Sequence, residues 1–440
     1  MKIENSIIKN LILLFLPLAA SALASSLLSF IERGFLAHYS MEALEASFAG
    51  TNLSRMFYFP SMAVPLMAQA FIGRYIGAHQ KSSVGPCIWQ MIWLAFFSLL
   101  LSLPLSFIIG KYYFHDTPLE KLASQYFYLL IPLNLFYPLI AAFSAFFVAI
   151  GKSRLMLIAT MSGYVINLFL SYIFIFGLGL GLFGAGISCI LAQGALALGL
   201  WMLFLRKPYR ETFHTNLWLL RPKELWEYLR SGLLSVAARF LSHSSWAAIT
   251  WLILQKGSDF IFVLTVGGTL AIFTNFVGDS LFQSTLNMAS GFIGAGEYNR
   301  LPRLMRSAFL ILCIATLTIA IPLLGFPESW VPLLFSSDKY EEIKDLLFPL
   351  LLGNWISFFV YTFNAIPNAF IFAFKDIKFT ILMGVMNWLE FCCLYGMIVF
   401  IGIPAQNFWA AQACAVLMCE SFLLYNRTRL LSLRAQKTTP

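Results

Sequence analysis

Residues 87–109, CIWQMIWLAFFSLLLSLPLSFII, decide the class of fold. The stretch contains no charged side chain, and its few polar residues are small or amide-bearing. As a helix rising about 1.5 Å per residue, it is long enough to cross the roughly 30 Å hydrocarbon core of a bilayer. It therefore predicts a transmembrane helix.

Eleven similar apolar stretches lie on either side of this one. The chain has 440 residues, of which 60% are hydrophobic and 11% are charged, with a mean hydropathy of +0.79. A water-soluble chain carries about 25% charged residues, and a membrane barrel shows short alternating strands. We therefore predict an all-α membrane protein with twelve spans at 11–37, 46–72, 87–109, 122–149, 155–176, 184–205, 230–254, 261–289, 304–325, 345–372, 379–402 and 404–425.

The distribution of positive charge gives the orientation. Of the 29 Lys and Arg residues, 21 lie at the two ends and in the even-numbered loops, and only 5 lie in the odd-numbered loops. Lys and Arg accumulate in cytoplasmic loops. We expect both termini in the cytoplasm of a bacterium and the spans in its inner membrane. The net charge of +9 is then a topology signal, and nucleic-acid binding is not expected.

The cysteines form no pattern typical of a disulfide framework or a zinc site. They lie almost entirely within apolar stretches, without a CxxC pair or histidines at zinc spacing, and we interpret them as small core residues. We expect no metal and no cofactor. The seven are Cys87, Cys189, Cys313, Cys392, Cys393, Cys414 and Cys419.

An internal repeat divides the chain into halves. Residues 76–78 (IGA) recur at 293–295, and Gly163 and Asn167 recur as Gly384 and Asn387. Six spans per half is an even number, so the halves share one orientation and are related by an axis along the membrane normal. We predict two pseudo-symmetric six-helix bundles at 1–207 and 230–426, a cytoplasmic linker at 208–229 and a cytoplasmic tail at 427–440.

The layout resembles the multidrug and toxic compound extrusion (MATE) family of secondary transporters. Residues 32–40 (ERGFLAHYS) and 43–46 (ALEA) are similar to the acidic opening motif of the family, and 72–78 (IGRYIGA) to its turn after the second span. Asn167 and residues 177–186 (GLGLGLFGAG) resemble the end of its fifth span. The likeness covers essentially the whole chain and implies transport rather than an enzymatic activity.

Three departures from the family pattern concern charge. The usual aspartate of the first span is Glu32, and the aspartate that often follows the fifth-span asparagine is Ser171. The acid that some members carry in span seven is absent, and Arg239 and His243 stand in that region.

Glu32 is the principal candidate for ion coupling. A charge in the bilayer costs about 3 kcal/mol on insertion scales, so an acidic residue inside a span is a functional candidate. Glu32 would bind and release the coupling ion, for which we expect a proton rather than sodium. The alternative is a packing role, with Glu32 in an ion pair with Arg33 or Arg55.

Five further polar residues are candidates. Asn167 and Ser171 lie one turn apart on one helix face and would assist ion binding or serve as hydrogen-bonding contacts between helices. Glu390 lies three residues after Asn387 on a shared face, and Asp279 is a similar acid within a span. We assign Asp279, Asn387 and Glu390 to the substrate cavity.

Arg33, Arg55 and Arg239 lie in or near spans. A cavity lined by them would favour an anionic or zwitterionic substrate. The alternative is that Arg33 and Arg55 extend to the membrane surface.

The predicted function is ion-coupled antiport that exports small organic compounds by alternating access. The expected partners are a small-molecule substrate and the lipid bilayer, and we expect a monomer. An alternative is a flippase for a lipid-linked anionic oligosaccharide, which the arginines favour and the span count does not. A membrane-embedded enzyme is disfavoured because the sequence contains no DDxxD, HExxH or GxSxG pattern.

Overall fold

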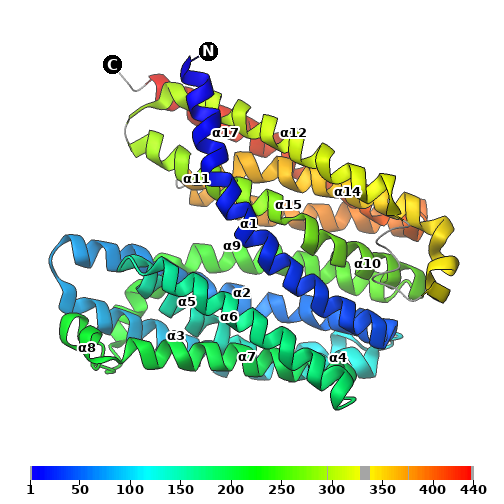
Figure 1. Ribbon diagram of the computed structural model, residues 1–440, viewed down its shortest axis with the longest axis horizontal. Coiled ribbons are helices and arrows are strands. Elements are labelled where there is room, and N and C mark those ends of the chain that lie inside the picture. Colours follow the sequence, from blue (N-terminus) through cyan, green and yellow to red (C-terminus); the bar gives the residue numbers. More distant parts are fainter. Residues whose placement is uncertain (1, 295, 328–336, 375, 438–440) are drawn as a thin grey trace. The chain divides into compact units, whose positions relative to one another are not determined.

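The computed structural model describes residues 2–294, 296–327, 337–374 and 376–437. Within those ranges the protein is almost entirely helical and contains no β-strand. The helices up to the middle of the chain (Figure 1) are α1 Lys2–Tyr39, α2 Met41–Gly77, α3 Val84–Tyr113, α4 Glu120–Leu129, α5 Leu133–Ala149, α6 Ser153–Tyr172, α7 Gly181–Phe204 and α8 Lys207–Phe213. Those that follow are α9 Pro222–Leu254, α10 Ser258–Thr274, α11 Phe276–Gly294, α12 Leu301–Gly325, α14 Ser337–Ala373, α15 Ile377–Gly396, α16 Phe408–Val416 and α17 Phe422–Lys437.

Short π-helical and 3-10 segments extend or precede several of these helices. A π-helix continues α6 at η2, Ile173–Gly177, and another continues α15 at η4, Met397–Ile401. A third, η6 at Leu417–Ser421, joins α16 to α17. The 3-10 turns are η1 Lys81–Ser83, η3 Tyr298–Arg300 and η5 Ala405–Asn407.

The predicted spans all coincide with helices. In the described part of the chain, eight helical stretches are long and apolar enough to cross a membrane, and two further spans are bent pairs. The bends are 40° between α4 and α5 and 41° between α10 and α11. The two remaining spans are α2 and α9, which are long enough but carry more polar side chains.

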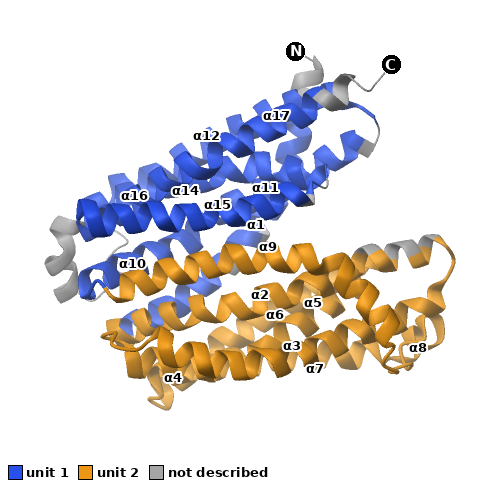
Figure 2. Ribbon diagram, turned by 180° about the vertical axis from the view of Figure 1, so that it is seen from behind, with its two compact units in different colours: residues 1–38, 256–440 blue, residues 39–255 orange. Residues whose placement is uncertain are grey.

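The chain folds into two compact units, which Figure 2 distinguishes by colour. Unit 1 contains residues 1–38 and 256–440, and unit 2 contains residues 39–255. The packing units thus differ from the predicted bundles at 1–207 and 230–426, which follow the sequence repeat. Each unit combines five spans of one half with the first span of the other half, α1 in unit 1 and α9 in unit 2. The predicted linker at 208–229 lies wholly within unit 2.

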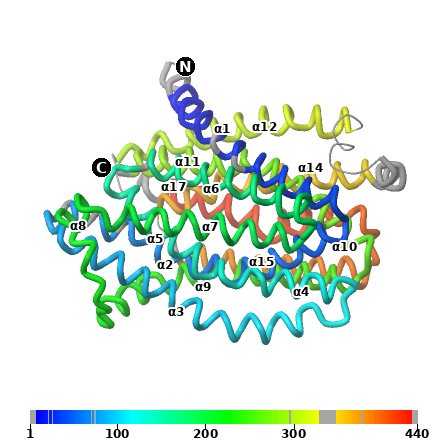
Figure 3. Tube along the Cα trace, turned by 60° about the horizontal axis from the view of Figure 1, so that its bottom comes forward, coloured from blue at the N-terminus to red at the C-terminus, as the bar shows by residue number. Residues whose placement is uncertain are grey.

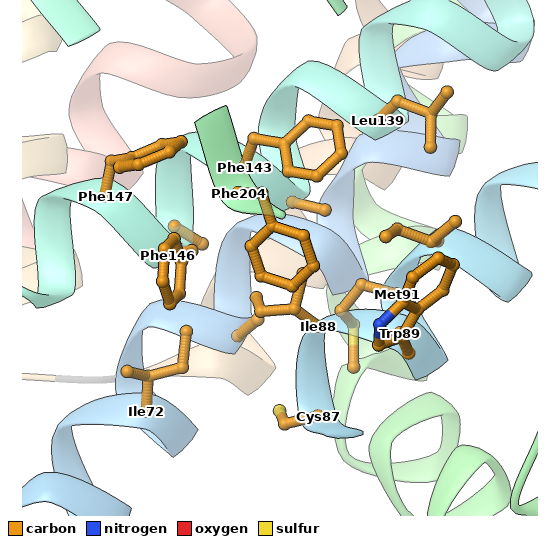
Figure 4. Close-up of a cluster of buried hydrophobic side chains, with 14 of the residues drawn as sticks. Ile72, Cys87, Ile88, Trp89, Met91, Leu139, Phe143, Phe146, Phe147 and Phe204 are labelled. Carbon is orange, nitrogen blue, oxygen red and sulfur yellow. The ribbon is translucent and has the colours of Figure 1, made fainter. Parts of the chain in front are cut away.

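Unit 2 is built around α2, which packs against α3, α5 and α9, as the trace in Figure 3 shows. Its apolar core gathers aromatic side chains from α3, α5 and α7 (Figure 4). The Phe204 ring lies with its centroid 5.0 Å from that of Phe146 and 5.6 Å from that of Phe143. These distances are typical of the offset and edge-on contacts that stabilise aromatic clusters.

In unit 1, α1 contributes its first half to the core. Ile7, Leu11 and Phe15 are buried among side chains of α11, α12 and α14. Toward its other end, Phe30 contacts Phe273 of α10, with 5.1 Å between ring centroids. The helix is therefore an integral part of unit 1, although it is the first span of the other half of the sequence.

Backbone geometry repeats between the two halves. In the turn after α2, the His79 amide donates to the Ile76 carbonyl at 3.1 Å, and His79 has φ 59°. In the turn after α11, 217 residues later, the Gly296 amide donates to the Ile293 carbonyl at 3.2 Å, and Gly296 has φ 74°. Ala295, part of the sequence repeat, lies outside the described residues.

The turns before the fifth and eleventh spans also correspond. The Lys152 amide donates to the Phe147 carbonyl at 2.7 Å, and the Asp376 amide donates to the Ile371 carbonyl at 3.1 Å. Both spans then end in a π-helix, η2 and η4. The duplication read from the sequence is therefore present in the backbone of the turns and helix ends.

Candidate functional site

Two antiparallel helices of unit 2, α2 and α9, contain most of its charged side chains within spans. Their register follows from two contacts: Asn52 Nδ2 donates to Thr250 Oγ1 at 3.3 Å, and the Phe59 ring stacks on His243 at 4.3 Å. From the first contact to the second, the chain advances seven residues along α2 and goes back seven residues along α9, so the two helices run antiparallel. Gly232 allows close approach further along, because a Cβ there would lie 2.8 Å from a methyl of Val64.

This register brings together the three basic groups that we call the arginine cluster: Arg55, Arg239 and His243. Arg55 lies one turn before Phe59 on α2, and Arg239 lies one turn before His243 on α9. Since the helices are antiparallel, the arginines flank the stacked rings, each displaced along the helix pair by about 6 Å. Both arginines are close enough to His243 to act on it electrostatically.

Aromatic side chains extend the cluster on one side. The Tyr58 ring lies 4.9 Å from that of Phe59 and 4.5 Å from that of Tyr137, between centroids. Tyr58 is only 8% exposed, and its hydroxyl lies within hydrogen-bonding reach of Arg55. The cluster therefore combines positive charge with apolar ring surface.

The charge of the arginine cluster is not balanced by any carboxylate of the described residues. Neither Arg55 nor Arg239 belongs to the ion pairs found in the described ranges. The Nε atom of Arg55 is buried and finds no hydrogen-bond acceptor there. Charged groups removed from water are costly unless an opposite charge or a hydrogen-bond partner compensates them.

The fifth-span candidates lie elsewhere in unit 2. Ser171 is fully buried, and its hydroxyl forms a 2.6 Å hydrogen bond with that of Ser188 on α7. Ser188 in turn donates to the Ala185 carbonyl at 2.8 Å. Asn167 is also buried, one turn earlier on α6. The hydroxyl of Ser171 is thus part of the α6–α7 contact.

Unit 1 contains a buried polar group of opposite character, which we call the carboxylate cluster: Glu390, Gln412 and Ser357. Glu390 on α15 is 7% exposed and accepts a hydrogen bond from Gln412 Nε2 of α16 at 3.0 Å. Ser357 of α14 donates to the other end of the Gln412 amide. Glu420, at the end of η6, lies close enough to Glu390 to interact electrostatically.

The other acidic candidates also belong to unit 1. Glu32 and Arg33 are half-buried on α1. Asp279 on α11 accepts a 2.7 Å hydrogen bond from the Tyr361 hydroxyl of α14. In all, the candidate residues of unit 1 are Glu32, Arg33, Asp279, Asn387 and Glu390, and those of unit 2 are Arg55, Asn167, Ser171 and Arg239.

Several residues in or beside the two clusters carry no sequence signal of their own. Gln412 and Ser357 are uncharged and stand in apolar helices, where hydropathy does not distinguish them from packing residues. Tyr58 is one of 17 tyrosines. Only the register of neighbouring helices connects them to Glu390 and Arg55. Among the described residues, no group of three or more His, Cys, Asp or Glu side chains has the arrangement of a metal site.

Comparison with known proteins agrees with this architecture. The MatE family model matches residues 17–173. The chain is 24% identical over 368 residues to a probable multidrug resistance protein NorM of Thermotoga maritima, covering 80% of this chain and 77% of the relative. It is 24% identical over 307 residues to a protein of the same description from Bacillus cereus, covering 66% of each.

Solved structures show the same fold. A multidrug resistance MATE family transporter in an inward-facing conformation aligns with TM-score 0.78 and 16% identity over 94% of this chain and 96% of its own. A MOP superfamily transporter from Pyrococcus furiosus, whose binding pocket is described as having reverse polarity, aligns with TM-score 0.77 and 16% identity over 98% and 97%.

These likenesses confirm the predicted all-α architecture of twelve spans in two bundles. The match begins within the first span, includes the motifs at 32–46 and 72–78, and ends within the fifth span. The match over residues 17–173 and the likeness to NorM proteins and MATE structures support the family predicted from the sequence, and with it a multi-pass membrane transporter rather than an enzyme.

Proposed function

We propose that the protein exports small organic compounds across the inner membrane of a bacterium, in exchange for protons, by alternating access. The match of residues 17–173 to the MatE family model and the likeness to relatives described as probable multidrug resistance proteins support export. The positive charge of the even-numbered loops and both ends supports a cytoplasmic location of the termini.

The observation that carries the coupling step is the position of Glu32. It is the only acidic residue in the membrane-spanning part of α1, Ile7–Tyr39, and it is half-buried there. Placing a carboxylate inside a span costs free energy of insertion into the bilayer. A role in ion coupling explains why the chain carries one at this position. Proton binding would neutralise Glu32 from one side of the membrane, and release to the other side would restore its charge.

A proton suits these side chains better than sodium. A hard metal cation needs several oxygen ligands, preferably with carboxylates among them. Ser171 supplies only a neutral hydroxyl where relatives often carry aspartate, and that hydroxyl is engaged with Ser188. A single carboxylate is sufficient to carry a proton.

Transport in proteoliposomes tests this proposal. Fluorescent dyes of either charge are loaded, and counterflow is followed under an imposed proton or sodium gradient for wild type, Glu32→Gln and Glu42→Gln. Glu42 is exposed in the first turn of α2 and serves as the matched control. We expect proton-driven transport in wild type and Glu42→Gln, and loss of at least tenfold in Glu32→Gln, on the scale of one essential charged group.

Two outcomes would contradict the proposal. Full proton-driven transport by Glu32→Gln would remove Glu32 from the coupling role and leave Glu390 as the next acid to test. Transport of neither dye by wild type under either gradient would overturn export itself.

A lipid flippase is the second candidate, and the arginine cluster is the observation that favours it. Three basic groups beside aromatic rings suit the headgroup of an anionic lipid. Movement of a fluorescent anionic lipid between leaflets, without any imposed gradient, would support this candidate over ion-coupled export.

A further inference from the structure

The arginine cluster has the composition of a binding site and not that of a structural ion pair. Unit 1 offers a structural arginine for comparison: Arg427 donates from Nε and Nη2 to the Asp376 carboxylate at 2.7 and 2.6 Å. Arg55 and Arg239 have no such carboxylate among the described residues. An arginine that only fixes helix packing is expected to have such a partner.

The helices α2 and α9 carry their arginines and rings at the same spacing. Each brings an arginine and a ring one turn apart, and the rings of Phe59 and His243 lie nearly parallel, with 14° between their planes. The arginines therefore approach this stack from opposite ends. Guanidinium groups bind carboxylate, sulfonate and phosphate oxygens by paired hydrogen bonds, so two arginines on either side of His243 suit such a group.

The cluster is unsuited to a cation. A positive group near His243 would meet the charges of Arg55 and Arg239, and no described acid of unit 2 forms an ion pair with either. Repulsion between like charges grows as the surroundings become less polar. The adjacent rings of Tyr58 and Tyr137 would instead pack against an apolar or aromatic body.

We propose that the arginine cluster binds the anionic group of an amphipathic organic anion, so that the substrates of this transporter are anionic rather than cationic. Arg55 and Arg239 hold the carboxylate, sulfonate or phosphate oxygens beside His243, and Tyr58 and Tyr137 contact the apolar body. This inference rests on the proposed function, since it assigns a substrate class to the exporter.

Equilibrium binding to the full chain in detergent tests the inference without any gradient. Two fluorescent naphthalene probes share one ring system, and one carries a sulfonate and the other a trimethylammonium group. We expect the sulfonate to bind wild type at least tenfold more tightly than the ammonium probe. Arg239→Gln and Arg55→Gln should each weaken sulfonate binding about tenfold or more, the effect of removing one charge-assisted hydrogen bond.

The controls separate charge from folding. Arg239→Lys keeps the positive charge and should retain most of the sulfonate affinity, and Arg210→Gln removes an exposed arginine of unit 2 and should have no effect. The ammonium probe should bind all variants alike, or Arg239→Gln slightly better. Equal binding of both probes to wild type, or unchanged sulfonate affinity in both Gln variants, would overturn the inference.

A competition arm identifies the source of the anion. If an anionic lipid displaces the sulfonate and loses that ability in Arg239→Gln, the bound group is a lipid headgroup. If it does not, the ligand is a soluble organic anion. Failure of proton-driven transport with intact sulfonate binding would overturn the proposed export and leave this site standing, whereas cation transport without sulfonate binding would do the reverse.

Discussion

The polar clusters inside the two units differ in sign although the backbone repeats. Unit 2 contains Arg55, Arg239 and His243 without a carboxylate partner among the described residues, whereas unit 1 contains Glu390 in a hydrogen-bonded group with Gln412. Backbone turns in the two halves match at the level of single hydrogen bonds. Duplication has thus preserved the geometry of the turns, and the polar interior has diverged around it.

The two clusters also differ in how well their polar groups are satisfied. The carboxylate cluster stabilises the folded protein through a chain of hydrogen bonds. The arginine cluster leaves a buried Nε atom without an acceptor in the described ranges. Sites that await a ligand are often less stable than the scaffold that holds them, so the clusters should respond oppositely to mutation.

The largest expected difference is between Glu390→Ala and Arg239→Met. Glu390→Ala removes the acceptor of the half-buried Gln412 amide and should cost about 1–3 kcal/mol of unfolding free energy. Arg239→Met removes an uncompensated charge and should leave stability unchanged or raise it by about 1 kcal/mol. Thermal unfolding in detergent, followed by tryptophan fluorescence, measures both.

Glu390→Gln is the matched control, because it keeps a side chain able to accept from Gln412. Its melting temperature should lie closer to wild type than that of Glu390→Ala. A loss of stability in Arg239→Met as large as that in Glu390→Ala would show that Arg239 has a structural role.

Mutations in the turns before α6 and α15 should produce a smaller difference in stability. Asp376 caps α15 by accepting from the Phe379 amide at 3.3 Å, and it is paired with Arg427. Lys152 holds the corresponding place before α6 and offers no such cap. Lys375, beside Asp376, lies outside the described residues.

Arg427→Ala should therefore cost about 2 kcal/mol, because the Asp376 side chain, 11% exposed, loses its charged partner. Lys152→Asp should add about 1 kcal/mol by supplying the missing cap. Hydrogen exchange measured by mass spectrometry would detect faster exchange at the start of α15 in the first variant and slower exchange at the start of α6 in the second. Unchanged exchange in both would contradict the assigned roles.

The smallest expected effects concern His79 and Gly296. Both have positive φ, which costs a residue with a side chain about 1 kcal/mol and costs glycine almost nothing. His79→Gly should stabilise the protein by up to about 1 kcal/mol, and Gly296→Ala should destabilise it by about 1 kcal/mol. The two effects should add in the double variant, measured by thermal unfolding, because the turns belong to different compact units.

The sequence was sufficient for the spans because crossing a bilayer imposes both length and apolarity on a helix. It did not reveal the break between α10 and α11, where apolar residues run past Asn275 without a proline. The helices α2 and α9 are also not among the spans that length and hydropathy identify in the described residues. Those two helices hold the arginine cluster.

The candidate residues were predictable one at a time, and their grouping was not. Arg55 and Arg239 stand out because charge is rare within spans. Their convergence on His243 depends on the antiparallel register of α2 and α9, helices from different halves of the repeat. Periodicity describes one helix, and it carries no information on which distant helix faces it.

The exchange of α1 and α9 between the packing units bears on how such a chain arose. In this packing, the first helix of each six-helix repeat packs in the unit formed by the other repeat. A single repeat on its own would therefore have no sixth helix to complete its unit. Two copies would have had to associate, each lending a helix to the other, before gene fusion joined them through residues 208–229. On this account the transporter began as a domain-swapped dimer, and the linker made permanent an association that already existed.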